Sequence, residues 1–195
     1  MRIIGIDPGT IHVGFGILEV DADGLRRIDG GSIDCPATAE LAKRLMGIHH
    51  GLQTVMREWK PDAAAVETVF FGKNSMAAIR IGEGRGVALL STAEAGVPVY
   101  AYEPALVKRS VCGNGRAAKE QVRRMVTSVL HLPEAPRTDH EADALAMAIC
   151  HALHIRRGLP ARRPGGGRTK AARGNKPGLP PNILAALERS TQRGL

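Results

Sequence analysis

The chain has 195 residues, of which 44% are hydrophobic, enough for one domain with an ordinary hydrophobic core. Its apolar runs fall far short of the ~20 residues that a membrane span requires, which argues against a membrane protein. The N-terminus reaches an acid and a proline by residue 8, so we expect no signal peptide. Three scattered cysteines, at 35, 112 and 150, show neither metal-ligand spacing nor a disulfide framework. These features predict a cytoplasmic protein in a reducing environment.

The net charge of +8 is concentrated at one end of the chain. Residues 1–155 contain 17 Lys and Arg against 18 Asp and Glu, whereas residues 156–195 contain ten basic residues and one acid. Residues 158–181 also hold six Gly and five Pro, a composition that cannot bury a core. We therefore predict a folded domain over 1–157 and a flexible basic tail over 158–195, in which 182–189 could form a short amphipathic helix. A solvated tail without function explains this composition equally well.

The predicted elements begin with three antiparallel strands and continue with alternating helices and strands. Residues 2–7, 11–20 and 25–34 are strand-like and are separated by turn sequences. The elements expected after them are a helix at 38–59, a strand at 63–67, a helix at 75–95, a strand at 97–102, and helices at 103–110, 117–131 and 138–156. This order predicts an α/β fold with a mixed five-stranded sheet flanked by helices.

Two acids end apolar strands of this predicted sheet. Asp7 follows "IIGI", and Glu67 follows "AAAV". Asp7 before Pro-Gly has three interpretations: an ordinary turn residue, part of a phosphate-binding loop like that of the actin-like ATPases, or a metal ligand at a strand end. A second acid at the end of a neighbouring strand favours the metal ligand. About 155 ordered residues are too few for the duplicated ATPase architecture.

The stretch "RTDHEADALA" at 137–146 opens the last predicted helix. Thr138 and Glu141 fit a capping box, in which Thr138 caps the helix and Glu141 reaches back to it. Asp139 in the first turn favours the positive helix end. Asp143 has no such explanation and lies among alanines, and His140 shares its helix face. The positive helix end also favours the neutral imidazole that binds metal.

Together, Asp7, Glu67, His140 and Asp143 form a set of three carboxylates and an imidazole. Oxygen-rich sites suit Mg²⁺ or Mn²⁺. Two such ions ~4 Å apart can activate water, hold a scissile phosphate and stabilise the leaving oxygen. The four residues are therefore candidate ligands for a pair of such ions.

These motifs resemble the RuvC family of Holliday junction resolvases, within the ribonuclease H-like superfamily. The resemblance covers about residues 1–155. The motifs that carry it, in order and at family spacing, are "GIDPGT" to "GFG" at 5–16, "ETVFFGKN" at 67–74, "GRGVALL" at 84–90, "VKRSVCGNGRAAKEQV" at 107–122 and "HEADALAMAICH" at 140–151.

The resemblance implies an acidic quartet formed by Asp7, Glu67 and Asp143, with His140 where many members have a fourth Asp. Asp139 is a candidate substitute for that ligand, although we favour His140. The family resemblance also implies a ribonuclease H-like fold and Mg²⁺ or Mn²⁺, two ions per active site. The implied function is that of a structure-specific endonuclease, which resolves four-way DNA junctions by paired, symmetric nicks in recombination and repair.

Two opposed nicks in a two-fold junction require two active sites, and hence a two-fold homodimer. The small-residue helix at 81–96 suits close packing against a second copy, although its glycines could instead pack against its own sheet. By resemblance, we also expect cooperation with the RuvA–RuvB branch-migration complex.

The candidate DNA contacts lie in two segments. Phe70 and Phe71 follow Glu67 directly, and in a chain with 3% aromatic residues such a pair suggests stacking on unpaired bases, although core packing also explains it. By resemblance, Phe70 is the stacking residue. The basic and polar candidates for backbone contacts, of which the family position favours Lys108 and Lys119, are Lys73, Asn74, Lys108, Arg109, Arg116 and Lys119.

Two other functions remain open at this stage. One is a ribonuclease H-like nuclease of the YqgF type, although those proteins are shorter and lack the long central segment found here. The other is a non-catalytic module that binds junction DNA, against which the intact acidic residues argue.

Overall fold

The computed structural model describes residues 1–68, 75–158 and 164. Met1–Pro164 form one compact unit. Of the predicted tail, only Gly158 and Pro164 lie within the described residues, so the domain boundary and the helix at 182–189 stay predictions. No helix in the described part of the chain has the length and apolar character needed to cross a membrane.

A mixed five-stranded sheet forms the centre of the unit, in the order β3-β2-β1-β4-β5. Its strands are β1 (Arg2–Asp7), β2 (His12–Val20), β3 (Leu25–Asp34), β4 (Ala63–Glu67) and β5 (Val99–Tyr102). The first three strands pair antiparallel, whereas β4 pairs parallel with β1 and with β5. The predicted fold class and sheet are confirmed.

Within the described residues, five helices flank the sheet: α1 (Leu41–Trp59), α2 (Ser75–Glu94), α3 (Pro104–Cys112), α4 (Lys119–Val129) and α5 (Asp139–Arg156). Each lies within a few residues of its predicted range. The first helix begins at Leu41 instead of 38, because the carbonyl of Pro36 accepts a turn hydrogen bond from the amide of Ala39.

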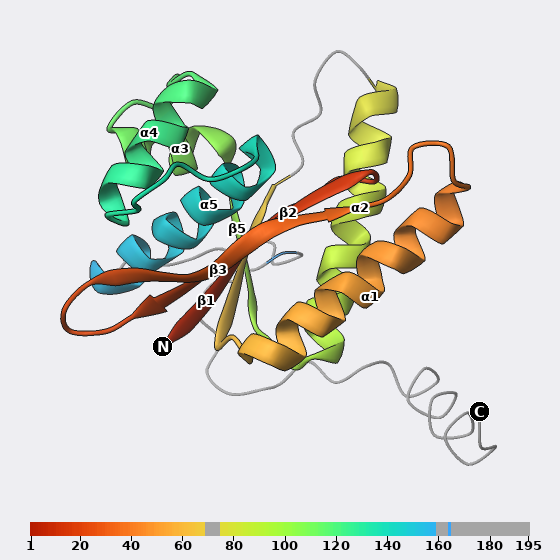
Figure 1. The fold of residues 1–195 in the computed structure, drawn as a ribbon, viewed down its shortest axis with the longest axis horizontal. Coiled ribbons are helices and arrows are strands. Elements are labelled where there is room, and N and C mark those ends of the chain that lie inside the picture. The colour runs from red at the N-terminus through yellow and green to blue at the C-terminus, as the bar shows by residue number, and fades with distance from the viewer. Residues whose placement is uncertain (69–74, 159–163, 165–195) are drawn as a thin grey trace, which may run out of the picture. The chain divides into compact units, whose positions relative to one another are not determined.

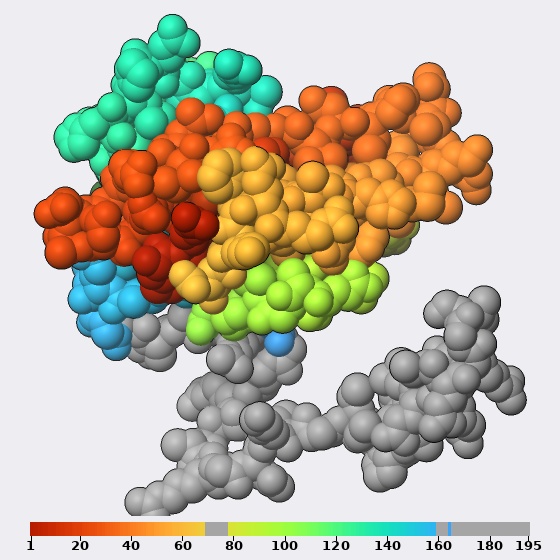
Figure 2. All heavy atoms as spheres, turned by 60° about the horizontal axis from the view of Figure 1, so that its bottom comes forward, coloured from red at the N-terminus to blue at the C-terminus, as the bar shows by residue number. Residues whose placement is uncertain are grey.

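The alternation of side chains along the strands divides the core into two layers. Ile3 and Leu18 pack on one face with α3, α4 and α5, whereas Ile4 and Ile17 pack on the other with α1 and α2. Figure 1 shows the two groups of helices on opposite sides of the sheet. Figure 2 shows α1 and α2 side by side, as expected from their mutual packing. Both sides of the sheet are therefore covered, and the strand ends are left to form a site.

The predicted capping box forms with one difference. The Thr138 hydroxyl accepts the amide of Glu141, as expected. The Glu141 carboxylate, however, accepts the amide of Arg137 instead of that of Thr138. Its other oxygen lies 2.6 Å from Arg27, and the side chain is 1% exposed. Glu141 is thus a buried link from α5 to β3, and the prediction of a simple cap was incomplete because Arg27 is distant in sequence.

Candidate active site

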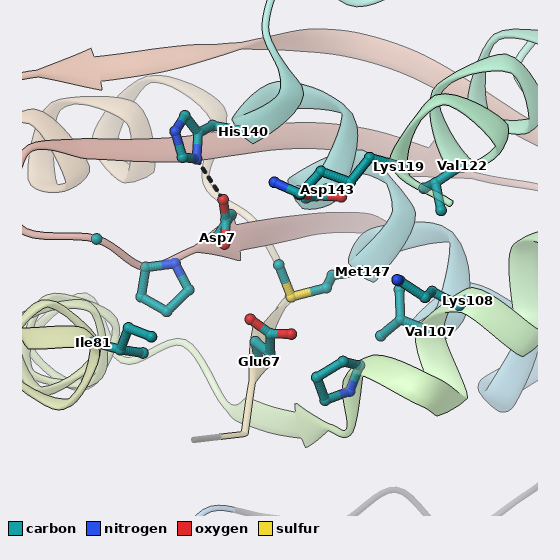
Figure 3. A pocket seen from close by; sticks show the side chains of 13 residues that line it. Asp7, Glu67, Ile81, Val107, Lys108, Lys119, Val122, His140, Asp143 and Met147 are labelled. Carbon is teal, nitrogen blue, oxygen red and sulfur yellow. Dashed lines mark hydrogen bonds and ion pairs between the residues drawn. The ribbon is translucent and has the colours of Figure 1, made fainter. Parts of the chain in front are cut away.

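A pocket of about 450 Å³ opens where β1 and β4 end, between α2, α3, α4 and α5. It is lined by the four predicted metal ligands, by two of the predicted DNA-binding lysines, and by apolar side chains (Figure 3). Its lining residues are Asp7, Pro8, Gly9, Glu67, Ile81, Pro104, Val107, Lys108, Lys119, Val122, His140, Asp143 and Met147. Residues from two strands and four helices therefore meet around one cavity.

Strand pairing brings Asp7 and Glu67 together. The parallel register of β1 and β4 aligns Ile3 with Ala63 and continues to Ile6 with Val66. The next residue of each strand is a catalytic candidate, Asp7 or Glu67. Because the carboxyl ends of adjacent parallel strands lie at the same sheet edge, the two acids reach the same pocket.

Close packing of α5 on the sheet brings His140 and Asp143 to the same edge. A Cβ atom at Gly5 would lie 1.9 Å from the carbonyl oxygen of Ala144, and one at Gly14 would lie 2.0 Å from that of His140. Any larger residue would push the helix away from β1 and β2. The glycines of the first two strands therefore set the distance between the helix ligands and Asp7.

His140 is bound to Asp7 in this arrangement. Its Nδ1 lies 2.7 Å from Oδ2 of Asp7, and this hydrogen bond is the main reason that the pKa of His140 is raised above its usual value. This direction is opposite to the effect expected of the positive helix end, because a hydrogen bond to a carboxylate favours the protonated ring. With Nδ1 donating to Asp7, Nε2 of the neutral ring remains as the acceptor that a metal requires.

Glu67 and Asp143 are poorly stabilised as anions. Burial, followed by the charge of Asp7, raises the pKa of Glu67 to about 7 and that of Asp143 to about 6. Lys119 partly offsets this, since its Nζ lies 3.9 Å from Oδ2 of Asp143. Three carboxylates around one pocket thus lack sufficient positive charge, which is the electrostatic condition that a bound divalent cation relieves.

The donor set fits a divalent cation by its chemistry. Carboxylate oxygens suit Mg²⁺ and Mn²⁺, and an imidazole nitrogen suits Mn²⁺ better than Mg²⁺. As the side chains lie, no three His, Cys, Asp or Glu residues in the described part of the chain are grouped closely enough to hold an ion. The Asp7–His140 hydrogen bond occupies groups that a cation would use, so binding would require side-chain adjustment.

The predicted DNA-binding residues divide into three groups. Lys108 and Lys119, the two lysines that the family position favoured for DNA contacts, line the pocket. Arg109 and Arg116 are exposed and do not line it. The others, Phe70, Phe71, Lys73 and Asn74, lie outside the described residues. The alternative fourth ligand Asp139 is exposed and is absent from the pocket lining, so His140 is the better-placed candidate.

Sequence reasoning missed two polar residues beside the site. The ring of His12 stacks on that of His140, with centroids 5.5 Å apart. Oδ1 of Asp34 accepts a hydrogen bond from Nδ1 of His12 at 2.8 Å. On the other side, Arg85 donates a hydrogen bond to the carbonyl of Glu67. A histidine at the start of a strand and an arginine inside a helix carry no sequence signal for these contacts.

The fold is that of ribonuclease H-like nucleases. The chain matches the structure of the fowlpox virus resolvase in complex with substrate Holliday junction DNA with a TM-score of 0.50 at 14% identity, covering 77% of this chain and 98% of that chain. At that identity the match shows the fold alone. It also matches the structure of Thermus thermophilus RuvC in complex with a Holliday junction substrate, with a TM-score of 0.77 at 41% identity. That match covers 84% of this chain and 99% of the Thermus chain.

Sequence comparison gives the particular family. The family model described as crossover junction endodeoxyribonuclease RuvC matches residues 3–151. The protein of that name from Chloroflexus aggregans is 49% identical over 152 residues, which cover 78% of this chain and 93% of the relative. Another protein of that name, from Syntrophomonas wolfei, is 46% identical over 154 residues, which cover 79% of this chain and 89% of the relative. The chain belongs to the RuvC family of endonucleases.

Proposed function

We propose that this chain resolves four-way DNA (Holliday) junctions in recombination and repair by paired, symmetric nicks that depend on a divalent metal. The observation that carries the proposal is the convergence of Asp7, Glu67, His140 and Asp143 on one pocket. Family membership supports it, since the Thermus relative is described in complex with a Holliday junction substrate.

In this proposal the four residues hold two Mg²⁺ or Mn²⁺ ions. When bound, such ions supply Lewis-acid activation of water and stabilisation of the leaving oxygen. Asp7 and Glu67, as neighbouring strand ends, fix the ligand spacing, and Asp143 and His140 complete the set from the helix. The raised pKa values of Glu67 and Asp143 support this assignment, because cation binding would ionise both carboxyls.

DNA binding is assigned to the rim of the pocket and to the segment after Glu67. Lys108 and Lys119 line the pocket, where an ammonium group can hold a phosphate beside the carboxylates. Arg109 and Arg116, both exposed, would contact the DNA backbone farther out. In the segment 69–74, we propose that Phe70 stacks on unpaired bases and that Lys73 and Asn74 contact phosphates.

The active form in this proposal is a homodimer, because paired nicks require two sites. The outer face of α2 is the candidate interface: a Cβ atom at Gly82 or Gly86 would meet open space, and Ile79 and Leu90 are more than half exposed. On the same helix, Gly84 packs inward against Gly9, so Gly82 and Gly86 are the glycines that this proposal assigns to the interface. By family membership, we propose cytoplasmic action with the RuvA–RuvB branch-migration complex.

The decisive experiment compares nicking of a synthetic four-way junction with nicking of a linear duplex of equal length, with Mg²⁺, with Mn²⁺ and with EDTA. We expect metal-dependent, symmetric nicks in the junction alone. Asp7→Asn and Glu67→Gln should abolish nicking and still bind the junction, because a lost metal ligand affects the chemistry more than DNA contacts.

Other outcomes would identify the alternatives. Junction binding without cleavage by the wild-type chain would indicate a non-catalytic junction-binding module. Equal cleavage of the junction and the duplex would indicate a ribonuclease H-like nuclease without junction specificity, such as one of the YqgF type. Nicking by Asp7→Asn at the wild-type rate would rule out the proposed site.

A further inference from the structure

Two consecutive residues of α2 contact the backbone beside two different catalytic candidates. A Cβ atom at Gly84 would lie 2.2 Å from the carbonyl oxygen of Gly9, in the turn that follows Asp7. The next residue, Arg85, donates from Nε to the carbonyl oxygen of Glu67 at 2.8 Å. The helix therefore touches the ends of β1 and β4 at the point where their acids enter the pocket.

The hydrogen bond to Glu67 involves its main chain, which leaves both carboxylate oxygens for the pocket. Glu67 is the last residue of β4, and the next amide, that of Thr68, binds the carbonyl of Tyr102. A charged donor on the carbonyl of Glu67 fixes the peptide that determines where its side chain points. Hydrogen bonds from a charged donor are stronger than those between neutral groups, so this contact favours one orientation of the Glu67 peptide.

The placement of Arg85 is itself costly, and this supports a specific role. Burial lowers the pKa of its guanidinium, whereas most arginines on a helix extend into water. Removing a guanidinium from water is unfavourable unless hydrogen bonds replace the lost hydration. The Glu67 carbonyl is one such partner, although it carries no full charge to attract the arginine. A general requirement for surface charge would not explain this location.

We propose that Arg85 is a positioning residue for Glu67, and that α2 thereby fixes the direction in which this acid leaves the end of β4. This inference rests on the proposed function, since it gives Glu67 the role of a metal ligand. Arg85 does not itself contact the metal or the DNA in this scheme. Its effect is on the affinity of the site for a cation, as for groups that orient metal ligands elsewhere.

The test measures Mn²⁺ affinity by electron paramagnetic resonance, without DNA, in the full chain and in Arg85→Met, Arg85→Lys and Arg80→Met. Arg80 is exposed on the same helix and serves as the control for loss of a positive charge. Circular dichroism checks folding, and junction binding in EDTA checks the DNA-binding surface. Single-turnover nicking is measured at saturating junction.

We expect Arg85→Met to stay folded and to bind the junction, with Mn²⁺ affinity weakened about 10–100-fold and with slower nicking. Arg85→Lys, which keeps a donor, should recover most of the affinity, and Arg80→Met should match the wild type. Wild-type Mn²⁺ affinity in Arg85→Met would overturn the inference, as would a lysine variant no better than the methionine variant. An unfolded Arg85→Met would also overturn it, since Arg85 would then serve stability. Failure of the wild-type chain itself to bind Mn²⁺ would instead overturn the proposed metal site.

Discussion

The imidazole of His12 lies against the imidazole of His140, with ring centroids 5.5 Å apart and an angle of 20° between the planes. Each ring is also held by a carboxylate, His12 by Asp34 and His140 by Asp7, at 2.8 and 2.7 Å. The His12–Asp34 pair thus supports the His140–Asp7 pair. A ring that is fixed at one nitrogen and stacked on one face has few orientations left. The sequence suggested a metal-binding role for His140 and Asp7, but not for His12 or Asp34.

Removal of the stacking ring should slow cleavage without abolishing it. Ring pairs are worth about 0.5–1.5 kcal/mol, so His12→Ala should lower the nicking rate by about 2–12-fold, whereas His12→Phe should retain most of it. The measurement is initial nicking rate at fixed Mg²⁺, with His50→Ala, an exposed histidine on α1, as the control. Identical rates for His12→Ala and wild type would show that the stack has no effect on the site.

The identity of the fourth ligand should determine the metal preference. Since Mn²⁺ accepts nitrogen more readily than Mg²⁺ does, the wild-type chain should cleave faster with Mn²⁺ at equal concentration. His140→Asp should remain active with a preference shifted towards Mg²⁺, and His140→Ala should be badly impaired. If His140→Ala keeps the wild-type rate and preference, Asp139 becomes the candidate ligand.

Cleavage should also be lost at acid pH, and at a higher pH than an ordinary histidine would give. Protonated imidazole cannot bind metal, and the hydrogen bond to Asp7 raises the pKa of His140 above 6.5. The apparent midpoint of the pH–rate profile at low metal should therefore lie above 6.5 and move down as metal concentration rises. A midpoint that does not respond to metal concentration would contradict competition between proton and cation at His140.

Glu67 should destabilise the metal-free protein as pH rises. Its pKa of about 7 in the folded chain, against 4.5 normally, means that the folded state holds an extra proton between those values, so stability falls across this window. Burial lowers the pKa of His151 to about 4, so this residue makes stability rise with pH between about 4 and 6.5. The contribution of Glu67 is therefore best measured as the stability difference between wild type and a Glu67 variant.

Glu67→Gln mimics the protonated carboxyl and supplies that difference. Its free energy of unfolding relative to wild type should increase by up to about 3 kcal/mol from pH 4 to pH 8 in EDTA. Mg²⁺ should reduce the stability advantage of Glu67→Gln over wild type at pH 8, because the cation stabilises the ionised side chain of the wild-type protein. Urea denaturation at the two pH values tests this, and a constant difference would mean that Glu67 titrates normally.

Deletion of residues 158–195 should leave a nuclease that is folded and active at low salt, because all the candidate ligands precede the tail. The tail is basic, so its removal should weaken non-specific DNA affinity and reduce the slope of affinity against salt concentration. Binding isotherms at several salt concentrations, for the full and truncated chains, provide the measurement. Equal affinities and slopes would show that the tail does not contact DNA.

The sequence by itself determined the sheet, the helices and the candidate ligands. Alternation in the strands and helical spacing elsewhere are local patterns, so each element lies near its predicted range. Asp7 and Glu67 were identifiable because an acid that ends an apolar strand requires an explanation. The parallel register that places these two acids side by side is seen only in the structure.

Only the tertiary structure decided how these groups are oriented and what holds them. The link from Arg27 to Glu141 spans 114 positions, and that from His140 to Asp7 spans 133. Such contacts depend on how closely α5 approaches the strand glycines, which no local pattern encodes. The pKa of His140 likewise depends on a carboxylate distant in sequence, a contact that its position at the helix start did not indicate. Local periodicity determines which elements form, whereas the protonation and orientation of site residues are set by neighbours that only folding brings together.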